Sequence, residues 1–213
     1  FIFGDNAFWV IILAVFSALI SEWLFQALTK RKISVFDASA LLTGLLLAYN
    51  LPPNAPLWMP VVGSFFAIII GKQVFGGLGQ NIFNPALAGR VLLMASWPTY
   101  MISFTRPLSY DAVTSATPLA LLKEGRALER ISYLDLFLGK RGGCIGEVCI
   151  LLLVLGAAFL LIRGYISWHI PVSYIVSAGF LAYIFGPRGF AMGDWLFHIF
   201  NGGLVLGAFF MAT

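Results

Sequence analysis

Residues 111–117 form a short polar segment in a chain that is 60% hydrophobic. The members that matter for chemistry are a carboxylate, hydroxyls and a small side chain: Asp111, Thr114, Ser115, Ala116 and Thr117. A hydroxyl nucleophile needs small neighbours, so that a modifying enzyme can approach, and a nearby carboxylate to orient or activate it. These residue types would allow covalent modification of a hydroxyl in this segment, and read on its own the segment also fits an ordinary Ser/Thr turn in a loop.

Two further carboxylates, Glu22 and Glu147, lie within or at the mouth of apolar segments. Burying a carboxylate in a membrane is costly, so we expect both residues to take part in the passage of a cation. For Glu147 there is the alternative that it stabilises the N-terminus of its own helix. Asp194, at the start of another apolar segment, is expected to be a helix cap.

The composition is that of an integral membrane protein, because the mean hydropathy is +0.93 and only 10% of the residues are charged. Much of the net charge of +4 gathers in residues 30–32 and in segment 106–141, without a continuous basic face. This pattern is typical of membrane-topology signals and argues against nucleic-acid binding. Cys144 and Cys149 belong to no metal-ligand motif, so we expect no metal site in this chain.

The expected fold class is an all-α integral membrane protein in which transmembrane helices alternate with broken half-helices. A membrane span needs about 20 apolar residues. The segments that qualify are 8–28, 57–75, 145–162 and 193–213, with a fifth, 166–185, interrupted by Pro171. Segments 38–51 and 84–97 are shorter and bounded by prolines, so they predict half-helices whose ends face a cavity or another helix. Arg90, within the second of these, is expected to face the protein or a ligand and not lipid.

The chain also repeats part of its own pattern. The matching triplets are Ile82, Phe83, Asn84 and Ile199, Phe200, Asn201. We interpret them as marks of an internal duplicated unit, an architecture that places a site between two halves near the bilayer midplane. The expected organisation is a first membrane repeat over 1–97 with a glycine-rich half-helix block, an extramembrane attachment loop over 98–142, and a second, truncated repeat over 143–213.

The basic residues 30–32 predict the cytoplasmic side of the membrane. Lys72 and Arg163 fall on that side if the segments between them cross in pairs, and segment 98–142 then lies outside. Whether the two repeats are parallel or inverted depends on whether segment 84–97 crosses the membrane or re-enters it.

Segment 71–90, rich in glycine and ending in an Asn-Pro helix start, resembles the D subunit of the Rnf ion-translocating electron transport complex. Segments 37–44 and 51–56 support this resemblance, which runs from about residue 8 to the end of the chain. The B subunit of the sodium-pumping NADH:quinone reductase belongs to the sister family. The resemblance implies that a dedicated flavin transferase joins FMN to Thr117 through a phosphoester bond. Ser115 departs from the glycine that many relatives have there.

The resemblance also implies a second, non-covalent flavin of the riboflavin type. Asn84 followed by Pro85 predicts a capped helix start, whose free N–H groups suit a flavin's carbonyls and anionic reduced form. Asn81 and Asn84 offer amide donors and acceptors to the edge of the ring. The alternative is that both asparagines only cap the broken helix.

By resemblance, the chain is a flavin-carrying subunit that relays electrons and couples them to Na⁺ or H⁺ translocation, in a complex that exchanges electrons between ferredoxin and NAD. It has no complete enzyme activity alone, and its partners are other subunits of the complex, the flavin transferase and the lipid bilayer. Its expected location is a prokaryotic plasma (inner) membrane, as a multi-pass protein. The alternatives are a counterpart of the B subunit in a sodium-pumping NADH:quinone reductase, a channel or transporter without redox chemistry, and a protein with a haem between His169 and His198.

Overall fold

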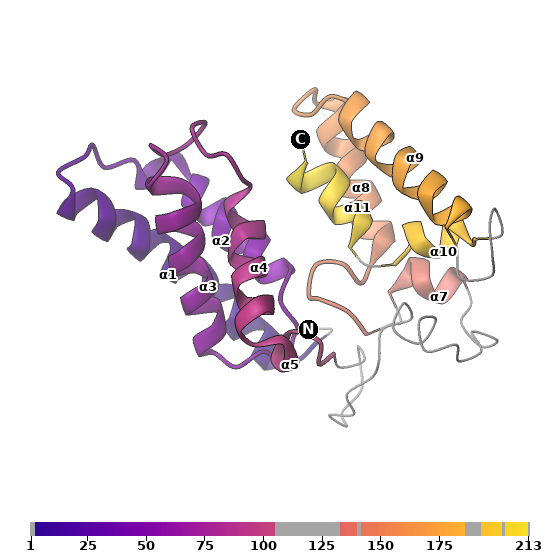
Figure 1. Cartoon of the computed structure of the whole chain (residues 1–213), viewed down its shortest axis with the longest axis horizontal. Coiled ribbons are helices and arrows are strands. Elements are labelled where there is room, and N and C mark those ends of the chain that lie inside the picture. The colour runs from indigo at the N-terminus through magenta and orange to yellow at the C-terminus, as the bar shows by residue number, and fades with distance from the viewer. Residues whose placement is uncertain (1–2, 105–132, 140–141, 186–192, 202, 213) are drawn as a thin grey trace.

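The computed structural model describes residues 3–104, 133–139, 142–185, 193–201 and 203–212, so segment 111–117 lies outside the described residues. The first part of the chain forms α1 (Asp5–Leu28), η1 (Val35–Asp37), α2 (Ser39–Tyr49), α3 (Trp58–Ile68), η2 (Ile69–Gln73), α4 (Pro85–Ser96) and α5 (Pro98–Met101). The second part forms α7 (Tyr133–Leu138), α8 (Ile150–Ile162), α9 (His169–Ile184), α10 (Trp195–Ile199), α11 (Leu204–Leu206) and η3 (Gly207–Met211). The described residues contain helices and no strand, and the two parts lie side by side as two helical bundles (Figure 1).

In the first bundle, α1, α2, α3 and α4 pack as neighbours (Figure 1). Short α2 and α4 confirm the half-length helices expected from the prolines, since α2 ends before Pro52 and α4 begins at Pro85. Glycines let these helices approach closely. A Cβ atom added at Gly44 would lie 2.7 Å from the carbonyl oxygen of Ala14, and one at Gly89 would lie 2.8 Å from that of Gly63.

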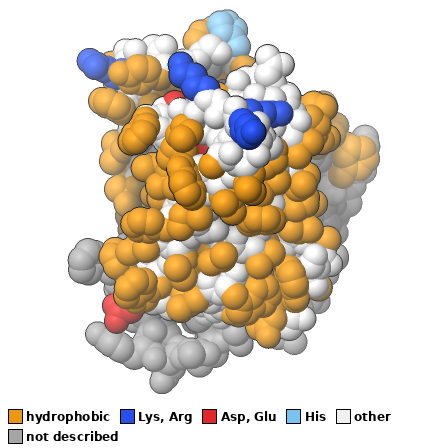
Figure 2. Space-filling view, turned by 90° about the vertical axis from the view of Figure 1, so that its left-hand side faces the viewer, with side chains coloured by type: hydrophobic (Ala, Val, Ile, Leu, Met, Phe, Trp, Pro, Cys, Tyr) orange, Lys and Arg blue, Asp and Glu red, His pale blue; other side chains and the backbone are white. Residues whose placement is uncertain are grey.

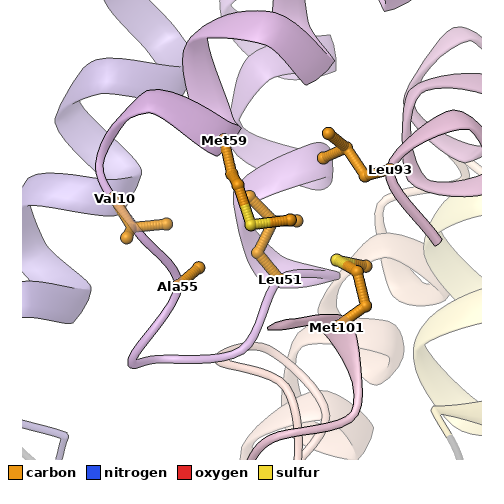
Figure 3. Close-up of a cluster of buried hydrophobic side chains, with 6 residues drawn as sticks. All are labelled: Val10, Leu51, Ala55, Met59, Leu93 and Met101. Carbon is orange, nitrogen blue, oxygen red and sulfur yellow. The ribbon is translucent and has the colours of Figure 1, made fainter. Parts of the chain in front are cut away.

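A buried apolar cluster closes one end of the first bundle (Figure 3). Its side chains come from α1, α3, α4, α5 and the loop between α2 and α3: Val10, Leu51, Ala55, Met59, Leu93 and Met101. Each of them is at most 4% exposed. Ile145, from the second part of the chain, packs against the same cluster, so the two bundles share this apolar contact.

The loops of the first bundle define two ends. The basic residues 30–32 follow α1, and the side chain of Arg31 reaches the carbonyl oxygen of Gln73 at the end of η2. At the opposite end, Trp58 packs against Trp97 with the ring centroids 4.9 Å apart. Segment 84–97 therefore runs from the basic end to the opposite end, and the chain continues toward segment 105–132 from there.

The second bundle corrects two expectations. Segment 193–213 is not one continuous helix, because α10 ends at Ile199 and the chain turns through Asn201 and Gly203 before α11. Gly203 has a φ of 69°, a left-handed conformation that glycine adopts without a steric penalty. Pro171 does not interrupt its segment, since it lies in the first turn of α9, where its missing N–H group has no helical partner to lose.

Helices α1 and α8 end in the same backbone arrangement. The amide of Arg31 donates to the carbonyl of Gln26, and the amide of Tyr165 donates to the carbonyl of Leu160. The intervening residues, Lys30 and Gly164, have φ values of 54° and 70°. This hydrogen-bond pattern closes a large share of all helices, so it agrees with a repeated hairpin while the duplicated unit stays a prediction.

The surface of the first bundle is largely apolar. Figure 2 shows hydrophobic side chains over most of this face, with Lys and Arg side chains gathered at one end. The exposed residues of α1 include Phe8, Phe16, Ile20 and Leu28, each more than half exposed. Among the described helices, α1 is long and apolar enough to cross a membrane, and the other apolar helices have 10–17 residues.

Candidate functional site

The polar centre of the first bundle is built around Glu22. This residue lies on α1 and is 0% exposed. Its Oε1 atom accepts hydrogen bonds from Lys72 Nζ and from Gln73 Nε2, both at 2.6 Å, and a longer one of 3.4 Å from Gln26 Nε2. The residue that the sequence predicts to take part in cation passage is thus a fully buried carboxylate, and its cationic partner lies on another element.

Lys72 and Gln73 reach the same oxygen although they are neighbours in sequence. They lie in η2, a π-helical turn that continues α3. Neighbouring residues of a regular α-helix point to different faces, and single π-turns of this kind occur frequently at functional sites. Arg31 Nη1 donates to the carbonyl oxygen of Gln73 at 2.9 Å and so ties this turn to the basic loop.

A second layer of hydrogen bonds joins the centre to the loop after α1. Lys72 Nζ also donates to the hydroxyl of Ser39, whose own hydroxyl and amide donate to Asp37. Partial burial acts to raise the pKa of Asp37, but the hydrogen bonds from Ser39 and the positive charge of Lys72 outweigh it, so the pKa is lowered. Gln26 and Ser34 exchange two further hydrogen bonds, each 2.8 Å long.

The second carboxylate oxygen of Glu22 is the unusual feature of this centre. Oε2 is buried and has no hydrogen-bond partner among the described residues. An unsatisfied buried polar group costs about 1–3 kcal/mol, and more when the group is charged. A buried ion pair is in itself weak evidence for stability. The unpaired oxygen therefore fits a site that exchanges partners better than a purely structural pair.

Glu147 lies elsewhere, in the segment that links the two bundles. It is 7% exposed, and its Oε1 accepts a hydrogen bond of 2.9 Å from the amide of Cys144. The adjacent Gly146 donates to the carbonyl of Tyr49, at the end of α2 remote from Ser39. The structure therefore does not bring Glu147 together with Glu22. Nor is Glu147 an acid of the first helical turn, because α8 begins at Ile150.

Asn84 caps α4 and also joins the two bundles. Its Oδ1 accepts from the amides of Ala86 and Leu87, and its Nδ2 donates to the carbonyl of Met211 at 3.1 Å. Asn81 instead donates to the carbonyl of Phe83 within its own loop, at 2.8 Å. The capping role of Asn84 is confirmed, and that of Asn81 is not observed.

Beside Asn84 lies an apolar groove of about 790 Å³. It is lined mainly by aromatic and aliphatic side chains of η2, α4 and the loop between them, including Phe75, Phe83, Leu87 and Val91. The rings of Phe75 and Phe83 meet edge to face with their centroids 6.5 Å apart. Asn84 is a polar residue in an otherwise apolar lining, which suits a planar ring with a polar edge.

Arg90 faces the protein, as expected. Its Nη1 donates to Asn50 Oδ1 at 2.6 Å, and its Nη2 lies 3.9 Å from the sulfur of Cys144. Asn50 in turn donates to the carbonyl of Leu46. These side chains, with Asn84, line the contact between the two bundles.

The haem alternative stays a hypothesis. His169 begins α9, and His198 lies in α10, whose Ile199 packs beside Gly179 of α9. Asp194 is a cap as expected, since it accepts a hydrogen bond from the amide of Phe197 at 3.0 Å.

Lys72, the partner of Glu22, was not predicted from the sequence, and neither were the contacts of Gln73 and Ser39 with this pair. The signal was present, because one basic and one acidic residue in separate apolar segments are expected to pair with each other. The attachment segment, with Asp111, Thr114, Ser115, Ala116 and Thr117, lies outside the described residues. Its proposed chemistry stays a prediction. In the described part of the chain, no cluster of three or more His, Cys, Asp or Glu side chains could hold a metal ion.

Comparison with known proteins gives the family. The chain is 49% identical over 215 residues to the D subunit of the Na⁺-translocating ferredoxin:NAD⁺ oxidoreductase complex of Acetobacterium woodii, covering 100% of this chain and 66% of that protein. It is 46% identical to the proton-translocating counterpart of Clostridium ljungdahlii, with 100% and 68% covered. The D subunit of the ion-translocating oxidoreductase complex of Escherichia fergusonii is 38% identical, with 99% and 71% covered. The chain thus spans about two thirds of the length of these relatives.

The match to the family description covers residues 1–213, and each of the three relatives is named as the D subunit of its complex. The resemblance found in the glycine-rich segment is thereby confirmed over the chain as a whole. The chain belongs to the NQR2, RnfD, RnfE family.

Proposed function

We propose that this chain is a membrane subunit of an ion-translocating electron transport complex, which relays electrons through FMN bound covalently at Thr117. The observation that carries the proposal is the similarity, over the full chain, to proteins named as the D subunits of such complexes. The polar segment from Asp111 to Thr117 supplies the acceptor hydroxyl and its carboxylate neighbour. A flavin transferase would load the protein, and electron transfer would require the other subunits of the complex.

A second flavin, of the riboflavin type, is proposed for the groove beside Asn84. The ring would lie against Phe75 and Phe83, and its polar edge would meet Asn84, which lines the groove, while Asn81 is proposed as a further contact from the loop before α4. Asn84 already uses its oxygen for two amides and one N–H group for Met211, which leaves one N–H group for a ligand. A bound flavin would supply one- and two-electron chemistry, while these residues bind and orient it and keep water from its apolar face.

The proposed route of the coupling ion passes Glu22. A carboxylate at 0% exposure, held by an ammonium and two amides, is the kind of group that can exchange one cation for another. Glu147 is a second proposed position on this route, at the junction of the bundles. The names of the relatives divide between sodium and protons at 49% and 46% identity, so overall similarity favours neither ion.

The same proposal includes a multi-pass location in a prokaryotic plasma (inner) membrane, contact with lipid, and two membrane repeats joined by an extramembrane loop. The apolar surface of the first bundle supports the lipid contact. The matching ends of α1 and α8 are compatible with the repeats, and the matching triplets at 82–84 and 199–201 are the sequence pattern on which the proposal of repeats rests. Relatives named for ferredoxin:NAD⁺ oxidoreductases favour this assignment over a component of a quinone reductase. A covalent flavin on Thr117 would separate it from a passive channel.

The test is the flavin on Thr117. Thr117→Ala should abolish the covalent flavin fluorescence of the denatured protein in a gel and leave the protein in the membrane. Thr114→Ala is the matched control, because it removes a hydroxyl from the same segment, and it should keep the fluorescence. Mass spectrometry should locate one FMN adduct on the peptide that contains Thr117. Persistent fluorescence in Thr117→Ala, with loss in Thr114→Ala, would move the attachment to Thr114 and refute the proposal.

A further inference from the structure

The ammonium of Lys72 occupies the place where a cation would bind Glu22. Lys72 Nζ lies 2.6 Å from Glu22 Oε1 and also donates to the hydroxyl oxygen of Ser39. Oxygen atoms from α1 and from α2 therefore converge on one point. That point is filled by a positive charge that belongs to the protein, and Lys72 is only 2% exposed.

The other carboxylate oxygen points to an exchange of partners. Glu22 Oε2 is buried and has no hydrogen-bond partner among the described residues. A pair that served only to hold α1 against η2 would be expected to satisfy both oxygens, because half-satisfied buried networks are costly. The free oxygen could take up a cation without the loss of any further hydrogen bond.

We propose that Lys72 is a tethered competitor for a sodium-sized monovalent metal ion at Glu22. This inference rests on the cation-translocating role proposed above, and it adds a mechanism that controls whether the cation site at Glu22 is occupied. The ion binds the carboxylate when the ammonium leaves, and the ammonium returns when the ion departs. Each state then has one positive charge beside Glu22, so the buried carboxylate is never left uncompensated.

The surroundings of Lys72 agree with such an exchange. The ammonium is a compact charge on a flexible four-carbon stem, so the proposed exchange needs rotation of the Lys72 side chain. Two other charged groups face the centre from the basic end. Arg31 is bound to the carbonyl of Gln73, and Asp37 is bound to Ser39. Gln26 and Gln73 supply neutral amides, whose Nε2 groups donate to Glu22 Oε1 and help to hold the carboxylate in place.

The test compares Lys72→Met with the wild type in the purified complex. The thermal unfolding of the chain is followed in sodium chloride and in choline chloride at equal ionic strength. A ligand that binds only the folded state raises the unfolding temperature. Without its competitor, Glu22 should bind sodium more tightly, so Lys72→Met should respond at a sodium concentration at least ten-fold lower than the wild type. Lys32→Met, which removes an exposed charge from the same end, should respond as the wild type does.

Equal sodium responses in Lys72→Met and the wild type would overturn the proposal, as would a response to lowered pH with none to sodium. If the Lys72→Met variant does not assemble into the complex, the sodium response of the Lys72→Arg variant provides the test. Its guanidinium can hold both carboxylate oxygens of Glu22, so the half-saturating sodium concentration should rise several-fold, and no change would overturn the proposal. The sodium response of Lys72→Met should persist in a Thr117→Ala background, so a failure of the flavin assignment is told apart from a failure of the competition.

Discussion

At the scale of single residues, Glu22 and Lys72 have a proposed role in ion passage and also stabilise the fold as a buried ion pair. A single substitution would change both properties at once. Removing one partner of a buried ion pair is expected to cost about 3–5 kcal/mol, because the other charge is left uncompensated. Replacing both charges by neutral groups of similar volume is often close to neutral. A loss of activity in Glu22→Gln alone would therefore not separate a broken ion route from a damaged fold.

The double variant Glu22→Gln with Lys72→Met makes this separation. We expect each single variant to lower the free energy of unfolding, and the double variant to recover most of that loss, with a coupling of about 0.5–3 kcal/mol between the sites. Both Glu22→Gln and the double variant should lose the sodium dependence of electron transfer while the Thr117 flavin stays attached. Denaturation curves and turnover at graded sodium concentrations test this. Normal sodium dependence in a stable double variant would reduce Glu22 to a packing residue.

At the scale of elements, the sequence predicted the ends of the short helices better than it predicted which elements pack against each other. Pro52 and Pro85 have local consequences for the backbone, so the short helices α2 and α4 follow from the sequence. The break at Gly203 was missed, because an apolar run conceals a single left-handed glycine. The pairing of Glu22 with Lys72 depends on how α1 packs against η2, which periodicity alone does not define.

Asn84 shows how one side chain can begin a helix and join two bundles, and variants can separate these functions. Asn84→Asp keeps the acceptor for the amides of Ala86 and Leu87 but loses the donor to Met211. Asn84→Ala loses both, so it should cost about 1 kcal/mol more of stability than Asn84→Asp, the usual value of an N-cap. Thermal unfolding of the purified protein measures the difference. Equal losses in the two variants would show that the cap contributes nothing and that only the contact with Met211 matters.

At the scale of the whole molecule, the described helices place the basic loop and the residues just before segment 105–132 at opposite ends of the first bundle; segment 105–132 contains the proposed flavin site and is called the flavin segment below. Arg31 contacts Gln73 at one end. At the other, the side chain of Asn54 donates to Ser103, just before segment 105–132 begins. The sequence left open whether segment 84–97 crosses the membrane or re-enters it. Helix α4, with 12 residues, runs between the two ends of the bundle, and its membrane topology stays a prediction. Only the positions of the basic residues predict which end of the first bundle faces the cytoplasm.

Paired cysteines at the two ends test the orientation. Positive residues near membrane spans favour the cytoplasm, so a cysteine at Lys32 should react with a membrane-impermeant thiol reagent only after the cells are lysed. A cysteine at Asn54, which is exposed at the opposite end, should react in intact cells. Cys144 and Cys149 are replaced by alanine in both variants, so that the added thiol is the one labelled. Labelling of Lys32→Cys but not of Asn54→Cys in intact cells would reverse the orientation, and it would place the start of the flavin segment in the cytoplasm.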